Sequence, residues 1–319
     1  MSRACRPWSP EAALSLPDGR LARLKVGASP FWVFVTMSSE RLNGDVVPLV
    51  SVAIPTYRGV AHLGAAIDSV LAQSLADFEL IVIDDNSPDE TAKVLAGYSD
   101  PRLICLRNPA NLGPAGNWNR CLLEARGRYF KLLPHDDLLA PHCLERQVAV
   151  LEADRDERIA LVFSARDVLG PDGRRLTRRG YPGGREGRIA AAAVMRSCIR
   201  RGTNLLGEPG AVMMRRALAA RVGAFDATYP YVIDLDYWFR LLAHGDGWYC
   251  RETLSAFRVS MQQWSVVIGA GQSRDFRSLV ARADAGGAIS ATAFDRWCSR
   301  FTPVLNNLGR LLFYRLYLR

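Results

Sequence analysis

Short apolar runs alternate with amphipathic segments from residue 49 onwards. The runs at residues 49–54 and 78–83 are rich in valine, leucine and isoleucine, which is typical of strands buried on both faces. Pro55 is expected to end the first strand. Between the two runs, apolar side chains recur at helical spacing at Leu63, Ile67, Val70 and Leu71. The pattern therefore predicts a strand, a helix and a second strand.

The alternation continues along the chain. Ser87, Pro88 and Glu90 resemble the start of a helix that continues through Val94 and Leu95. Further strands are predicted at residues 102–106, 129–133, 159–164 and 210–214, and further helices at residues 117–125, 141–152, 190–199, 218–222 and 234–243. The Arg- and Gly-rich residues 174–188 are expected to form a loop or hairpin that becomes ordered on binding a ligand.

Strands that alternate with helices predict an α/β fold, with a mostly parallel sheet and helices on both faces. In such sheets, ligands bind beyond the carboxyl ends of the strands. Three polar clusters, residues 55–57, 84–87 and 135–137, follow predicted strands. The topology therefore brings them to one edge of the sheet.

Asp136 and Asp137 are adjacent carboxylates at the end of a predicted strand. Mg²⁺ or Mn²⁺ binds carboxylate and phosphate oxygens, so the pair could hold a cation that neutralises a diphosphate leaving group. A solvated turn is the alternative interpretation of the same residues.

Two further acidic pairs are candidates for function. Asp84 and Asp85 could accept hydrogen bonds from a nucleobase or ribose, or could form a turn that caps the next helix. Asp234 and Asp236 begin a predicted amphipathic helix, where the helix dipole favours carboxylates. Capping does not require two such residues, so one of them is a candidate general base.

Composition narrows the class of protein. The chain has 319 residues, of which 49% are hydrophobic, so one large α/β domain or two small domains can form a core. The net charge of +9 favours anionic partners, namely nucleic acid, phospholipid head groups or nucleotide diphosphates. Seven scattered cysteines without a C-x-x-C motif indicate buried thiols in a reducing cytoplasm. No apolar run is long enough to predict a transmembrane helix.

At these motifs the sequence resembles the family-2 glycosyltransferases, which have the GT-A fold and use nucleotide-sugar donors. The resemblance spans residues 48–265. It rests on four ordered segments: residues 50–57 (VSVAIPTY), 68–87, 108–119, and 207–226 with the sequence GEPGAVMMRR followed by VGAFD.

The resemblance implies roles for individual residues. Pro55, Thr56, Tyr57, Asp85, Asn117 and Asp136 would hold the nucleotide, usually uridine or thymidine diphosphate. Asp136 and Asp137 would meet the metal, and Asp234, in preference to Asp236, would deprotonate the acceptor hydroxyl in a single inverting displacement. Two positions depart from the family pattern: Pro134 stands where an additional Asp is common, and Ser260 where a His is common.

The implied organisation has three parts. Residues 1–47 form a poorly ordered extension, with Met37 as an alternative start; residues 48–265 form the GT-A domain, divided into a nucleotide-binding half (48–137) and an acceptor half (138–265); residues 266–319 form a helical tail. Aromatic and arginine residues within 294–319 suit either an anionic membrane surface or packing against protein.

The arginines of residues 174–188 suit either a phosphate-bearing acceptor or solvent. The predicted function is sugar transfer to a glycan or lipid-linked acceptor in cell-surface polysaccharide or glycolipid synthesis. The predicted location is the cytoplasm or the inner face of the plasma membrane. A catalytically silent nucleotide-sugar-binding protein is the alternative. Nucleic-acid binding is not expected, because no helix-turn-helix, zinc or RNA-recognition motif is present.

Overall fold

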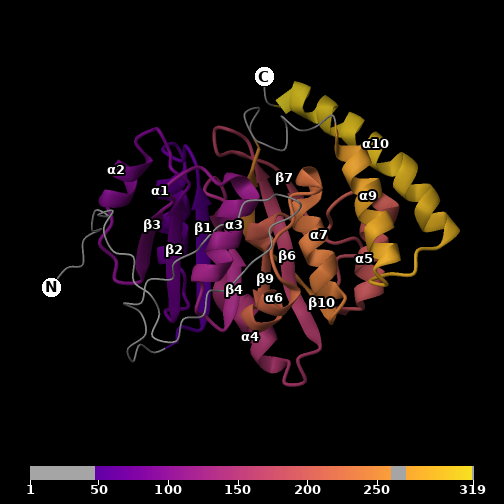
Figure 1. Cartoon of the computed structure of the whole chain (residues 1–319), viewed down its shortest axis with the longest axis horizontal. Coiled ribbons are helices and arrows are strands. Elements are labelled where there is room, and N and C mark those ends of the chain that lie inside the picture. The colour runs from indigo at the N-terminus through magenta and orange to yellow at the C-terminus, as the bar shows by residue number, and fades with distance from the viewer. Residues whose placement is uncertain (1–46, 260–270, 318–319) are drawn as a thin grey trace.

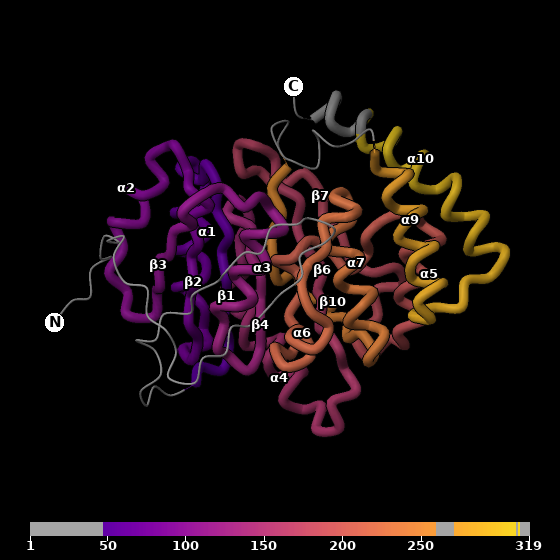
Figure 2. Tube along the Cα trace, in the orientation of Figure 1, coloured from indigo at the N-terminus to yellow at the C-terminus, as the bar shows by residue number. Residues whose placement is uncertain are grey.

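The computed structural model describes residues 47–259 and 271–317, in which a ten-stranded sheet forms the centre (Figures 1 and 2). Its strands lie in the order β3 (Leu103–Arg107), β2 (Phe78–Asp84), β1 (Val50–Thr56), β4 (Tyr129–Leu132), β9 (Val212–Arg215), β6 (Ile159–Leu169), β10 (Asp246–Arg258) and β5 (Leu138–Leu139). Two further strands, β7 (Arg175–Arg179) and β8 (Gly187–Ile189), pair with β6 and β10.

The direction of the strands decides where the site forms. β3, β2, β1 and β4 are mutually parallel, β9 is antiparallel to both β4 and β6, and β10 is parallel to β6. Consequently β1, β2, β4, β6 and β10 all end at the same edge of the sheet. The predicted α/β fold with a mostly parallel sheet is confirmed, although β5, β7, β8 and β9 run against that direction.

Helices cover both faces of the sheet (Figure 1). They are α1 (Leu63–Leu71), α2 (Thr91–Ala96), α3 (Gly113–Glu124), α4 (Cys143–Ala153), α5 (Ala191–Arg201), α6 (Arg216–Val222), α7 (Ile233–Leu242), α9 (Gln272–Ala285) and α10 (Ala293–Tyr317). One hydrophobic core includes residues of α1 and α4, and a second includes residues of α5, α7 and α9. The sheet lies between these two cores. The apolar runs of the sequence predicted strands buried on both faces, and β1 and β2 are indeed buried along their whole length.

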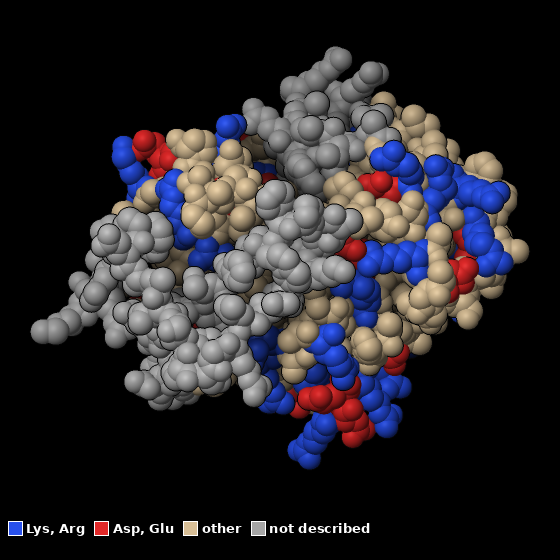
Figure 3. Space-filling model, viewed as in Figure 1, with Lys and Arg blue, Asp and Glu red and all other residues tan. Residues whose placement is uncertain are grey.

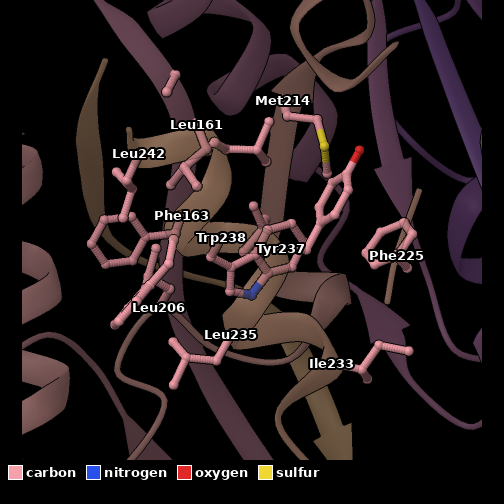
Figure 4. Packing of buried hydrophobic residues seen from close by; sticks show 14 of the residues in the cluster. Leu161, Phe163, Leu206, Met214, Phe225, Ile233, Leu235, Tyr237, Trp238 and Leu242 are labelled. Carbon is pink, nitrogen blue, oxygen red and sulfur yellow. The ribbon is translucent and has the colours of Figure 1, made fainter. Parts of the chain in front are cut away.

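Figure 4 shows how α7 is fixed in the second core. Trp238 and Tyr237 are fully buried, and Phe225 stacks on the Tyr237 ring with centroids 3.8 Å apart. The Trp238 indole donates a 3.3 Å hydrogen bond to the carbonyl of Gly207. α7 is therefore tied to the loop that precedes β9, and this tie sets the position of the first turn of the helix.

Several predicted boundaries were wrong. β1 continues through Pro55 to Thr56, where its pairing with β4 has already ended, so the proline interrupts no ladder on that side. α2 begins at Thr91 rather than near Ser87, whose hydroxyl instead accepts a 2.9 Å hydrogen bond from the Arg58 amide. α3 begins at Gly113, ahead of the predicted residue 117.

Other differences concern longer segments. β10 was not predicted as an element, whereas α9 and α10 both lie within the tail that was predicted to be helical. The arginine-rich segment contributes two strands that pair with different partners rather than with each other. The predicted extension up to residue 46 lies outside the described residues, as do Ser260 and the predicted boundary between domain and tail at 265–266. No described helix is long and apolar enough to span a membrane.

Candidate active site

A cleft of about 1900 Å³ lies at the edge of the sheet where the parallel strands end. It brings together seven residues predicted for the site: Pro55, Thr56, Tyr57, Asp85, Asn117, Asp136 and Asp234. Two predicted residues, Asp137 and Asp236, are not part of its lining.

Asp85 organises the wall of the cleft formed by the start of α3. Its Oδ1 accepts hydrogen bonds from Asn108 Nδ2 (2.6 Å) and the Leu112 amide (2.8 Å), and its Oδ2 accepts one from the Gly113 amide (3.0 Å). Asn108 also donates to Asn117 Oδ1 at 3.2 Å. The carboxylate thus fixes the loop and helix start around itself while it still faces the cleft.

Thr56 presents a buried hydroxyl to the same wall. The residue is 1% exposed, and within the described residues Thr56 Oγ1 has no hydrogen-bond partner. A buried hydroxyl without a partner is costly, so this oxygen is suited to a ligand bound in the cleft. The neighbouring residue Tyr57 is 40% exposed, and its ring offers a flat surface for stacking.

Asp136 and Asp137 differ in their surroundings although they are adjacent. Asp136 lines the cleft, whereas Asp137 is 1% exposed and its Oδ1 accepts a 3.0 Å hydrogen bond from the Arg258 amide. Burial, with the nearby charge of Asp136, raises the pKa of Asp137 well above its ordinary value. Asp136 is therefore the carboxylate that is open to a ligand, and Asp137 lies behind it.

The surroundings of Asp136 suit a hard cation only in part. Across residues 47–259 and 271–317, no group of three or more histidine, cysteine, aspartate and glutamate side chains is arranged to hold a metal ion. Mg²⁺ commonly uses one or two carboxylates and takes its remaining ligands from phosphate and water. Asp136 fits that donor set when a nucleotide diphosphate is bound beside it, with Asp137 as a second, buried carboxylate.

Asp234 occupies the first turn of α7 and faces the cleft. Asn204 Nδ2 donates to its Oδ2 at 2.8 Å, and the Leu235 amide donates to its Oδ1 at 2.7 Å. Burial, reinforced by the charge of Glu208 and opposed by these two hydrogen bonds, raises the pKa of Asp234 to about 7. A carboxylate with this pKa is suited to accept a proton near neutral pH.

Asp236, the other candidate base, lies elsewhere. It is 2% exposed, and its Oδ2 accepts a 2.9 Å hydrogen bond from Arg240 Nε. Its Oδ1 is 3.5 Å from a nitrogen of Arg282. The structure therefore gives Asp236 a role in joining α7 to α9, and leaves Asp234 as the carboxylate of the pair that reaches the cleft.

The sequence did not single out Glu208 and Arg166, which also line the cleft. The two side chains form an ion pair between the loop before β9 and the end of β6. Although burial opposes ionisation of Glu208, the charges of Arg166 and Arg179 hold its pKa below the ordinary value. Glu208 lies within the GEPG motif of the sequence, but nothing in the sequence shows its partner, which is 42 residues away.

A family model described as glycosyl transferase family 2 matches residues 51–222, which is more than half of the chain. The chain belongs to glycosyl transferase family 2. This family-2 chain is 31% identical over 219 residues to an uncharacterized glycosyltransferase of Rickettsia typhi, with 66% of this chain and 64% of the relative covered. The chain covers less than two thirds of the length of such curated relatives.

Two further proteins resemble this family-2 chain. The Escherichia coli enzyme WfgD, named as a UDP-Glc:alpha-D-GlcNAc-diphosphoundecaprenol beta-1,3-glucosyltransferase, is 38% identical over 103 residues, which is 32% of this chain and 41% of WfgD. The crystal structure of Staphylococcus aureus TarS 1–349 in complex with UDP-GlcNAc has a TM-score of 0.60 at 14% identity and covers 85% of this chain and 76% of that one. The TarS likeness shows that the two proteins share a fold.

Proposed function

We propose that this glycosyltransferase moves a hexose from a nucleotide-diphosphate-sugar to an acceptor hydroxyl, with inversion at the anomeric carbon and with Asp234 as the general base. The observation that carries the proposal is the position of Asp234. It faces the same cleft as Thr56, Asp85 and Asp136, and its pKa is raised to about 7.

The donor half of the proposal rests on the wall built by β1, β2 and the start of α3. Tyr57 offers a ring to the nucleobase, and Thr56 and Asp85 offer oxygens to the N–H group of the base and the O–H groups of the sugar. A UDP- or dTDP-sugar is the proposed donor. The UDP-GlcNAc in the TarS complex and the UDP-Glc in the name of WfgD support the uridine nucleotide.

The proposed cofactor is Mg²⁺ or Mn²⁺, with Asp136 and Asp137 as its protein ligands. When bound, such a cation neutralises charge on the departing diphosphate. Asp136, which lines the cleft, would be the exposed ligand of the cation, and Asp137 would be a second, buried carboxylate ligand.

A single displacement accounts for the transfer. The acceptor oxygen forms a bond to the anomeric carbon as the bond from that carbon to the diphosphate oxygen breaks, and the electron pair leaves with the diphosphate. Asp234 Oδ2 or Oδ1 takes the acceptor proton. Attack opposite the leaving group inverts the anomeric centre, and the cleft needs only this one base.

The proposed acceptor is a glycan or a lipid-linked sugar, and the proposed pathway is cell-surface polysaccharide or glycolipid synthesis in the cytoplasm or at the inner membrane face. The diphosphoundecaprenol-linked acceptor in the name of WfgD supports this class. A nucleotide-sugar-binding protein without turnover is the alternative, and it predicts donor affinity without metal-dependent release of nucleoside diphosphate.

Substitution in the first turn of α7 tests the proposal. Asp234→Asn removes the base but keeps the shape, so transfer from a panel of UDP- and dTDP-sugars should fall by about three orders of magnitude. UDP affinity, measured by calorimetry, should stay within a fewfold of wild type. Asp236→Asn is the matched control and should keep most of the turnover of its folded fraction. Near-wild-type turnover of Asp234→Asn would reject the assignment.

A further inference from the structure

The helix α10 faces the rest of the protein with its polar side. Asp295 is fully buried and accepts a 2.6 Å hydrogen bond from Arg200 of α5. Ser299 is 5% exposed, and Asn306 Nδ2 donates a hydrogen bond to the carbonyl of Arg201 in α5. Figures 1 and 2 show this helix along the outer side of α5 and α9. Small and polar side chains therefore make the contact with the protein.

The opposite side of α10 is apolar and exposed. Seven large hydrophobic residues have 43% to 65% of their surface accessible: Phe294, Trp297, Phe301, Val304, Leu305, Leu308 and Leu312. At about 100° per residue, they fall within an arc of about 100° on one helix face. We call this set the apolar stripe. At a rise of about 1.5 Å per residue it is about 27 Å long.

The polarity of α10 is thus reversed relative to an ordinary surface helix. A helix of a water-soluble protein buries its apolar face against the core and shows polar residues to water. Exposed apolar patches of this extent mark sites that contact a partner or a membrane. The aromatic residues are mutually packed, with the Phe294 and Trp297 rings stacked at 6.0 Å, so the stripe is preformed.

The charges around the apolar stripe indicate which surface it meets. By sequence, α10 carries four arginines and a single carboxylate, and that carboxylate, Asp295, is buried beside Arg200. Arg300 is exposed next to the stripe, and the Arg200 guanidinium lies 5.4 Å from the centre of the Phe294 ring. Figure 3 shows basic side chains, which by sequence are all arginines there, on the side of the molecule where α9 and α10 lie, with a few acidic side chains among them. Aromatic and leucine residues flanked by arginines suit the interface of an anionic membrane.

The same helix forms part of the cleft. Asn306, Gly309 and Arg310 of α10 line the cleft that contains Asp234, and Leu305 belongs both to this lining and to the apolar stripe. The rim of the cleft is therefore continuous with the exposed apolar face. We propose that the apolar stripe of α10 docks on an anionic membrane surface and so presents the cleft to an acceptor held in that membrane.

The docking half of the proposal is independent of catalysis, whereas the acceptor half rests on the proposed function. Docking is tested by flotation of the full chain with vesicles of phosphatidylcholine alone or with added phosphatidylglycerol. The chain should float with the anionic vesicles, and 0.5 M salt should weaken this binding because the Debye length falls to a few ångströms. Flotation of Asp234→Asn should be unchanged.

Substitutions on the stripe supply the decisive comparison. The triple variant Trp297→Gln, Phe301→Gln and Leu308→Gln keeps good helix formers and touches no residue that lines the cleft. Its partition onto anionic vesicles should fall at least roughly tenfold. Leu123→Gln, at an exposed leucine of α3, is the matched control and should float like wild type. Equal flotation of the triple variant and the control would overturn the proposal.

Two further measurements complete the test. The first asks whether a second copy of the chain covers the apolar stripe, and the second asks whether docking serves transfer to an acceptor in the membrane. A stable dimer in light scattering that persists with anionic vesicles, without flotation, would assign the stripe to a second copy of the chain and overturn the proposal. If docking serves catalysis, the triple variant should lose kcat/KM for a polyprenyl-diphosphate-linked sugar in vesicles while keeping wild-type hydrolysis of the donor in solution. Equal losses with both substrates would overturn the acceptor half.

Discussion

Asn204 Nδ2 donates a 2.8 Å hydrogen bond to Asp234 Oδ2 across the cleft wall. The same nitrogen donates to the Gly207 carbonyl at 2.8 Å, and Asn204 Oδ1 accepts from the Leu206 and Gly207 amides at 3.1 Å. The asparagine therefore connects the loop before β9 to the first turn of α7. Because it donates to the carboxylate, it favours the ionised form that a general base requires.

The rate of transfer should rise with pH through about 7, because Asp234 can accept a proton only when it is ionised. Asn204→Asp removes the donor and adds a second carboxylate, which should raise the pKa of Asp234 further. We compare the rate at pH 6.5 with the alkaline plateau of the same protein. This ratio should be roughly tenfold lower for the variant than for wild type. A pH–rate profile with saturating donor measures this, and an unchanged acidic limb would refute the role of Asn204.

Glu208→Gln should move the acidic limb in the opposite direction. The charge of Glu208 raises the pKa of Asp234, so its removal should lower that pKa and preserve activity at lower pH.

The stability of the protein should also depend on the titration of Asp234. The pKa of Asp234 in the folded protein lies above the ordinary 3.8, so folding favours the protonated side chain. The contribution of this protonation to the free energy of unfolding is fully present below pH 3.8 and is lost as pH rises through about 7. Asp234→Asn should therefore flatten the fall in melting temperature between pH 5 and pH 8.

Thr56→Val tests the nucleotide wall. Because Thr56 Oγ1 has no partner among the described residues, its loss should leave the free energy of unfolding unchanged or slightly higher. The Kd for UDP should rise roughly two- to tenfold, the value of one hydrogen bond. Calorimetry and thermal unfolding separate the two effects.

Ser51→Ala, in the same strand, is the control. Ser51 donates to Glu79 Oε1 at 2.6 Å and accepts from the Gly127 amide at 2.7 Å. This variant should be destabilised by about 1–3 kcal/mol without a change in UDP affinity. An unaltered Kd for Thr56→Val would exclude the hydroxyl from nucleotide binding.

The sequence predicted the order of elements in the nucleotide-binding half because β1 and β2 are buried along their whole length and have largely apolar sequences. It did not predict β10, in which Arg251 and Glu252 interrupt the apolar pattern. There the pairing with β6 shifts register between Cys250 and Thr253, so the periodicity of a strand is broken. Fully buried Lys131, which donates to Gln147 Oε1 at 2.8 Å, is another feature that composition does not reveal.

The acidic pairs show a second limit. Sequence places Asp136 beside Asp137, and Asp234 two residues from Asp236, but the direction of each side chain depends on contacts distant in the chain. Asp137 is turned towards the amide of Arg258, 121 residues away. Asp236 faces the arginine of α9 at position 282. Carboxylates that are close in sequence therefore need not share the cleft, and only one member of each pair lines it.

The difference between Asp136 and Asp137 leads to a prediction about metal dependence. Asp136→Asn removes the carboxylate that lines the cleft and should raise the Mn²⁺ concentration for half-maximal transfer by roughly ten- to a hundredfold. Asp137→Asn should have the smaller effect on this concentration, since that side chain is buried against Arg258. Mn²⁺ titrations of donor turnover provide the comparison. Equal effects would mean that both carboxylates contribute alike, and a turnover independent of metal would remove the cation from the mechanism.

The attachment of α10 to the protein depends on Gly202, the C-cap of α5. Its φ of 63° lies in the left-handed region, and a Cβ there would be 2.4 Å from the backbone nitrogen of Pro303 in α10. Gly202→Ala should therefore lower the free energy of unfolding by about 1–3 kcal/mol, from backbone strain together with the displacement of α10. Hydrogen exchange should show the loss of protection concentrated in α10.

Gly309→Ala, within α10, makes the matched comparison. A Cβ at that position meets nothing within 4 Å, so the change should be neutral or stabilise the helix by up to about 1 kcal/mol. If Gly202→Ala retained wild-type stability and α10 protection, the close contact between α5 and α10 would not hold the helix in place. The orientation of the apolar stripe would then need another cause, because this contact fixes which face of α10 turns away from the protein.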